Sequence, residues 1–148
     1  MYLLDTSIVS EFRRIRPNVR VLRMREHVHG LEWLKAVPAD QLFLSALTIG
    51  EIQAGIEVIR ERDAAKAREI EAWLENVVAS HSVLPMDAAV FREWARLKHR
   101  ASETLMEDEM IAATARVHRL IVVTRNPRNF AQLSVELLNP FEEAEEEA

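Results

Sequence analysis

The chain lacks several residues on which common chemistries depend. None of its 148 residues is cysteine, which excludes a disulfide framework and thiolate chemistry. Only three residues are glycine, too few for a glycine-rich phosphate-binding loop. No apolar run approaches the roughly 18 residues that are needed to span a bilayer. Because Asp5 follows only four residues, we expect no signal sequence, no membrane contact and a cytoplasmic protein.

The charge of the chain is concentrated at two places. Residues 142–148 contain five glutamates, and without them 19 acidic residues face 19 basic residues. We therefore expect one neutral domain over 1–141 and a disordered acidic tail over 142–148. The second concentration is a crowd of arginines: Arg13, Arg14, Arg16, Arg20, Arg23 and Arg25. This stretch is either a solvated face or arm, or a basic patch that binds nucleic acid.

Short apolar runs alternate with longer helical patterns along the chain. The apolar runs are continuous, as in strands that are covered on both faces, and lie at 2–4, 42–45, 82–85, 120–124 and 135–138. Apolar residues at helical spacing lie between them, at 49–59, at 70–78, from Asp87 to residue 97, and after Asp108. Strands that alternate with helices predict an α/β sandwich with a mostly parallel sheet.

Four oxygen-bearing side chains are expected at one edge of this sheet. Asp5 ends the first strand, and Glu51 falls in the first turn of the helix after 42–45. Asp108 opens the helix before the strand at 120–124, and Asn126 follows that strand. Ligands of open parallel sheets bind outside the carboxyl ends of the strands. Crowded carboxylates repel one another, and a hard cation such as Mg²⁺ removes that cost and can act on a phosphodiester.

Purely structural roles compete with this interpretation. The sequence from Thr48 to Glu51 is a capping-box pattern, in which Glu51 bonds back to the Thr48 amide. The acids at 107–109 suit the start of a helix through its dipole and through capping. Asp5 and the two hydroxyl residues after it suit a helix cap in the same way. Spacing alone leaves both interpretations open.

Four segments carry a resemblance to a known family. They are "MYLLDTSIVSEF", "FLSALTIGEIQAGIE", "EDEMIAATARVHRLIVVTRNPRNF" and "LLNPF". In this order they resemble PIN-domain ribonucleases, in particular the VapC- and FitB-like toxins of bacterial toxin–antitoxin operons, over residues 1–141. The resemblance implies a five-stranded parallel sheet with helices on both faces. It further implies cleavage of RNA that depends on Mg²⁺ or Mn²⁺, inhibition by a small antitoxin protein, and a homodimer joined with antitoxin in a hetero-oligomer.

The resemblance also assigns roles to single residues. Asp5, Glu51 and Asp108 match the three acids that hold the metal in the family, so we expect them to be both metal ligands and catalytic residues. Asn126 matches the fourth acidic position, where relatives carry Asp or Asn, and Asn129 matches another place where Asp is frequent. This side of the site therefore carries less charge than in relatives with Asp. Arg125 is expected to reach a phosphate.

Two rival functions stay open at this point. A PIN fold with Asn126 and Asn129 is also compatible with a protein that binds RNA or antitoxin without efficient cleavage, and RNA cleavage that EDTA abolishes separates the two. A doubly wound phosphoacceptor or phosphatase with Asp5 as nucleophile is the other rival. That chemistry needs a lysine near the phosphate, and no lysine lies near a candidate strand end.

Overall fold

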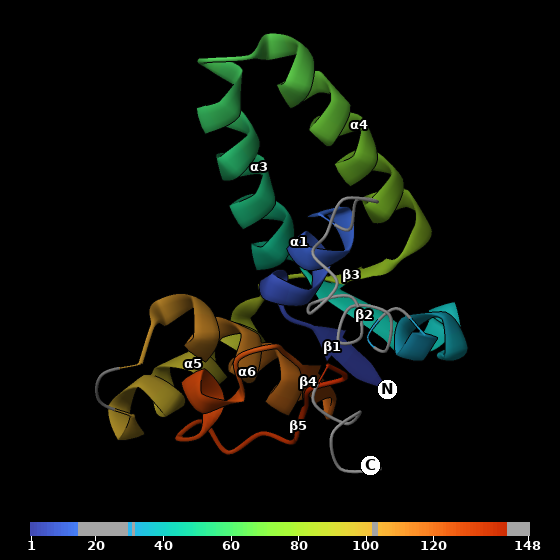
Figure 1. Cartoon of the computed structure of the whole chain (residues 1–148). Coiled ribbons are helices and arrows are strands. Elements are labelled where there is room, and N and C mark those ends of the chain that lie inside the picture. Colours follow the sequence, from blue (N-terminus) through green and yellow to red (C-terminus); the bar gives the residue numbers. More distant parts are fainter. Residues whose placement is uncertain (15–29, 31, 102–103, 142–148) are drawn as a thin grey trace.

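The computed structural model describes residues 1–14, 30, 32–101 and 104–141 (Figure 1). The predicted acidic tail at 142–148 lies outside the described residues, as does the arginine-rich stretch beyond residue 14. No helix in the described part of the chain is both long enough and apolar enough to cross a membrane.

Five parallel strands form a single sheet in the order β3-β2-β1-β4-β5. They are β1 Tyr2–Leu4, β2 Leu42–Ser45, β3 Ser82–Leu84, β4 Ile121–Val123 and β5 Leu137–Leu138. The five predicted strands are thus confirmed, although the last three are shorter than the apolar runs. The first strand of the chain lies at the centre of the sheet, where Leu4 pairs with Val123 of β4. The carboxyl ends of β1 and β4 are therefore side by side.

Within the described residues, helices and two short 3-10 turns connect the strands, and residues 32–36 are helical as well. The bounds are α1 Thr6–Arg14, η1 Ala39–Gln41, α3 Ala46–Arg60, α4 Ala64–Ser80, α5 Ala88–Arg100, α6 Met106–His118 and η2 Pro127–Phe130. The predicted capping box is wrong: α3 begins at Ala46, and its cap is Ser45, whose hydroxyl accepts the Leu47 N–H. Glu51 consequently lies in the second turn of α3 rather than the first. The helix expected to open at Asp108 begins two residues earlier.

The two faces of the sheet are covered by different helices. Leu3 and Val122 are buried against α5 and α6. Leu4 and Val123, the next residues along each strand, are buried against α1, α3 and α4 on the other face. Side chains alternate between the faces of a strand, so one strand contributes to both cores. This confirms the predicted sandwich.

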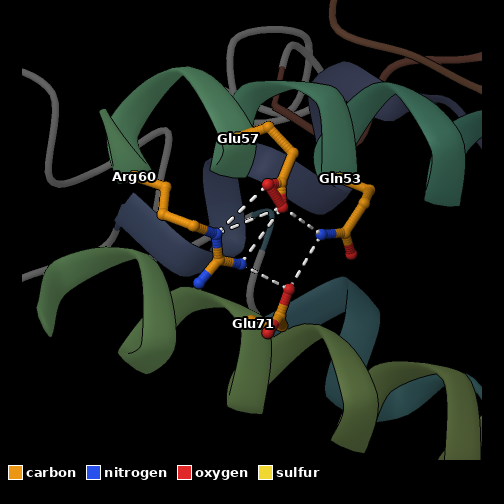
Figure 2. A network of polar contacts seen from close by, with 4 residues as sticks. All are labelled: Gln53, Glu57, Arg60 and Glu71. Atoms are coloured by element: carbon orange, nitrogen blue, oxygen red, sulfur yellow. Dashed lines mark hydrogen bonds and ion pairs between the residues drawn. The ribbon is translucent and has the colours of Figure 1, made fainter. Parts of the chain in front are cut away.

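Helices α3 and α4 form a hairpin that extends away from the sheet (Figure 1). Ile56 of α3 and Ile70 of α4 are buried between the two helices. A polar network ties their rims: the Gln53 side chain and the Arg60 guanidinium both donate to Glu71 Oε2, at 2.8 and 2.7 Å (Figure 2). Arg60 also pairs with Glu57 one turn earlier. Partly exposed ion pairs are worth little singly, but here one carboxylate joins two donors across the hairpin.

Gly30 is the glycine that packing requires. A Cβ atom on Gly30 would lie 2.5 Å from Cε1 of the buried Phe141 ring. We predict that Gly30→Ala lowers the free energy of unfolding by about 1–3 kcal/mol, because the ring or the backbone must move. Gly50→Ala is the matched control: its Cβ would meet nothing within 4 Å in α3, so stability should rise by about 0.5–1 kcal/mol. Chemical denaturation measures both, and a Gly30→Ala protein as stable as the unsubstituted chain would contradict the packing argument.

Candidate functional site

Asp5 is held rigidly at the carboxyl end of β1. Its side chain is buried, and its Oδ1 accepts the Thr6 N–H at 2.9 Å. The hydroxyls of Ser7 and Thr124 both donate to Oδ2, each at 2.9 Å. Thr124 reaches Asp5 because the pairing of β1 with β4 places the residues that follow both strands together. A carboxylate offers about four acceptor sites, so three donors orient Asp5 and leave room for one more partner.

Glu51 is joined to Asp5 through the intervening threonine. The Thr6 hydroxyl donates to Glu51 Oε1 at 3.0 Å and lies 2.9 Å from the hydroxyl of the buried Thr48. Burial raises the pKa of Glu51, the Thr6 hydrogen bond lowers it, and the charges of Glu107 and Asp5 raise it again. The net shift is upward, so Glu51 keeps a proton more readily than an exposed glutamate. The second acid is thus oriented by hydroxyls rather than used as a helix cap.

Asp108 is the least satisfied acid of the site. Its Oδ2 is buried and has no hydrogen-bond partner among the described residues. Burial, followed by the charges of Asp5, Glu107 and Glu51, raises its pKa to about 6. Asp108 is not the cap of α6, because that position is Leu105 and makes no side-chain capping bond. The Asp108 side chain therefore has no role in holding the described fold together, and its free oxygen is available to an external ligand.

The acids are close enough for their charges to interact, but they do not form a complete set of metal ligands. The charges of Asp5 and Glu107 raise the pKa of both Glu51 and Asp108, and the charge of Glu51 also raises that of Asp108. Within the described ranges, no three Asp, Glu or His side chains converge tightly enough to hold a metal by themselves. Mg²⁺ usually binds through one or two carboxylates and keeps several waters. The unpartnered Asp108 oxygen and the mutual repulsion therefore fit a hydrated divalent cation. Glu107, one of the acids expected to favour the start of the helix, adds its charge to the site.

Asn126 is connected to the site through its backbone. Its N–H donates to the Thr124 hydroxyl at 3.0 Å, and that hydroxyl in turn donates to Asp5. The Asn126 side chain is exposed and makes no hydrogen bond within the described residues. Arg125 lies with its guanidinium 4.9 Å from the centroid of the Phe141 ring, and its contact with a phosphate stays a prediction.

Two openings adjoin the acids. The isoleucine groove, about 270 Å³, is lined by Thr6, Ser10, Glu51, Ile52, Gly55, Ile56, Ile59 and Ile70. The Asp108 cleft, about 200 Å³, is lined by Thr104, Leu105, Asp108, Arg128, Asn129, Ala131 and Gln132. Sequence reasoning found the three acids and Asn129 but neither opening. The threonines that orient the acids could have been found from the sequence. Thr6 directly follows a strand-end acid, and Thr124 directly follows an apolar run.

Comparison with known proteins gives consistent similarities. The family model described as "PIN domain" matches residues 2–136. "Toxin FitB" of Neisseria gonorrhoeae is 30% identical, covering 95% of this chain and 99% of that protein. "VapC ribonuclease Y4jK" of Sinorhizobium fredii is 32% identical, covering 97% and 100%. The crystal structure of FitAcB from Neisseria gonorrhoeae superposes with a TM-score of 0.81 at 30% identity, covering 96% and 99%.

The crowding of Asp108 predicts a gain in stability when its charge is removed. Its pKa is about 6 in the folded chain and about 4 when unfolded, so ionisation costs stability progressively as the pH rises between these values. Above pH 6 the whole cost is present. In chelator at neutral pH, Asp108→Asn should raise the free energy of unfolding by about 1 kcal/mol, a figure reduced for solvent screening at this partly exposed group.

The same denaturation series at lower pH provides the check. The gain should shrink towards zero as the pH approaches about 4, where the aspartate is protonated in both states. Asp40→Asn is the control, since Asp40 is exposed in η1 and should change stability by less than about 0.5 kcal/mol. A loss of stability in Asp108→Asn at neutral pH would show that the carboxylate stabilises the fold.

Proposed function

The chain belongs to the PIN-domain family and is a toxin of the VapC/FitB type from a toxin–antitoxin system, and from this membership we propose that it is a metal-dependent endoribonuclease neutralised by a cognate antitoxin. The observation that carries the proposal is the buried, unpartnered Oδ2 of Asp108 beside Asp5 and Glu51. RNA as substrate is supported by the name of the relative called a VapC ribonuclease. We propose a cytoplasmic location and a homodimer joined with antitoxin.

Asp5 and Asp108 would hold Mg²⁺ or Mn²⁺, with Glu51 completing the acidic site. When bound, the ion supplies an activated water and neutralises charge that develops on the phosphodiester. Asp5 enters this role preoriented by three hydrogen bonds, so little reorganisation is needed on binding. Asp108 provides the oxygen that lacks a partner.

Glu51 is suited to handle the proton of the attacking water. Thr6 donates to its Oε1, which leaves Oε2 to orient the water and accept a proton. A raised pKa brings the carboxylate closer to the operating pH, which favours general-base action. Asn126 would position a water through its side-chain carbonyl, without adding charge. These are the roles of the four predicted site residues in the proposal.

The isoleucine groove is the proposed site of the antitoxin. Its floor combines apolar side chains of α3 and α4 with Thr6 and Glu51, so a segment lying in it covers the acid that orients the water. An amphipathic helix places apolar residues into such a groove at helical spacing. Binding and inhibition would then be one event, as a toxin–antitoxin pair requires.

The ribonuclease proposal predicts that one substitution abolishes cleavage without unfolding the chain. Asp5→Asn should lower the rate of RNA cleavage by more than about a hundredfold, because the metal loses an oriented carboxylate. The circular dichroism spectrum should stay unchanged. Asp40→Asn is the matched control and should cut at the unsubstituted rate. EDTA should stop cleavage by the unsubstituted chain, and Mg²⁺ or Mn²⁺ should restore it.

Two results would argue against this proposal. Cleavage by Asp5→Asn at the full rate, or cleavage that survives EDTA, would exclude the metal site. RNA binding by the unsubstituted chain without any cleavage would favour the non-cleaving PIN fold.

The groove proposal is tested by two glycines of the same helix. Gly55 lines the isoleucine groove and Gly50 does not, and a Cβ on either would meet nothing within 4 Å. Gly55→Arg should weaken binding of the proposed cognate antitoxin by at least about tenfold, because a long side chain fills the groove. Gly50→Arg should bind it normally. Both substitutions favour the helix, so a folding defect is not expected. Equal binding by both variants would remove the antitoxin from the groove.

A further inference from the structure

The Asp108 cleft contains polar side chains that the fold does not use. Arg128, Asn129 and Gln132 line it, and none of their side chains makes a hydrogen bond or ion pair with another described residue. Arg128 shares the cleft with Asp108, and Arg128 is not among the charges that shift the pKa of Asp108. A guanidinium and two amides without partners among the described residues therefore line the same cleft as Asp108. Nothing in the proposed chemistry at Asp5, Glu51 and Asp108 requires them.

The wall that carries these side chains is anchored to the core. Phe130 and Leu133 are almost fully buried against α5 and α6. The Leu133 N–H donates to the Phe130 carbonyl at 3.0 Å, which tightens the turn after η2. With these two apolar residues fixed inward, Arg128, Asn129 and Gln132 are exposed on the outer side. A binding wall built this way is preorganised, so little ordering is required when a ligand enters.

We propose that the Asp108 cleft is a subsite for one nucleotide of single-stranded RNA beside the cleaved bond, with Arg128 on a backbone phosphate and Asn129 and Gln132 on the base edge. This inference rests on the ribonuclease function proposed above. Arg provides a planar fork that matches phosphate oxygens. The amides of Asn and Gln each offer both a donor and an acceptor, which a base edge requires.

The size and the opposite wall of the cleft fit one base. Its volume of about 200 Å³ is below the roughly 300–1,000 Å³ of sites that enclose drug-sized ligands. Leu105, on the side of α6, leaves 63% of its surface exposed and offers an apolar contact for the face of a base. The cleft would therefore determine which base lies next to the cut. The sequence preference of the enzyme then depends on residues outside its acids.

Binding measurements test the phosphate contact without cleavage. The full chain carrying Asp5→Asn is titrated with a labelled random-sequence single-stranded RNA at several salt concentrations. Arg128→Gln in this background should weaken binding by about tenfold at low salt and reduce the salt slope by about 0.7, the share of one phosphate on a single strand. Arg92→Gln is the control. Arg92 is exposed in the first half of α5 and does not line the Asp108 cleft. Its affinity and slope should be unchanged.

A second titration tests the base contact. In the Asp5→Asn chain, the affinities for the four homopolymeric RNA oligonucleotides are compared. Gln132→Ala should reduce the ratio between the affinity for the tightest-bound and the affinity for the weakest-bound oligonucleotide by about fivefold or more. Gln41→Ala, at the opposite edge of the sheet in η1, should leave the ratio unchanged.

Each outcome decides between the proposals. An unchanged salt slope in Arg128→Gln, or an unchanged base preference in Gln132→Ala, overturns the nucleotide subsite. If these variants lose antitoxin binding and bind RNA normally, the nucleotide subsite is also overturned, and the cleft is assigned to the protein partner. Absence of RNA binding by the parent chain overturns both proposals. The predicted losses, together with no cleavage by the chain that retains Asp5, would support a nucleotide-binding cleft, but they would refute the ribonuclease function and with it a position beside a cleaved bond.

Discussion

The parallel pairing of β1 with β4 is the contact on which the site depends. Its register places Leu4 opposite Val123, so the next residue of each chain segment, Asp5 and Thr124, meet at the carboxyl edge of the sheet. A shift by one residue would turn the apolar side chains of β1 to the wrong faces and separate the carboxylate from its donor. The two cores on either side of the sheet fix this register. Packing far from the acids therefore sets their geometry.

The fold tolerates its crowded carboxylates in different ways. Asp5 is compensated by three hydrogen-bond donors, and Glu51 by the Thr6 hydroxyl. Asp108 receives no such compensation and keeps a buried oxygen without a partner. This inequality is informative, because a purely structural cluster would be expected to satisfy each buried oxygen. An oxygen without a partner is what the proposed cation site would use.

Much of the fold could be predicted from the sequence, because continuous apolar runs and helical spacing report burial directly. Because ligands of parallel sheets bind outside the carboxyl ends of the strands, Asp5 and Asp108 could also be predicted to lie at one edge of the sheet. Helix starts were predicted less well, since Ser45 outcompeted the Thr48 pattern as the cap of α3. The Asp108 cleft was beyond sequence reasoning because it depends on how Phe130 docks in three dimensions. Local patterns predict elements, whereas openings arise from their packing.

If Asp5 and Asp108 bind a divalent cation together, calorimetric titration of the metal-free chain with Mn²⁺ should detect that site. We expect a Mn²⁺ site whose affinity falls at least about tenfold in Asp108→Asn, because the ion loses a charged ligand. Asp87→Asn, which alters a carboxylate that caps α5, should leave the affinity unchanged. Equal Mn²⁺ affinity in the unsubstituted chain and in Asp108→Asn would show that Asp108 is not a ligand of the ion.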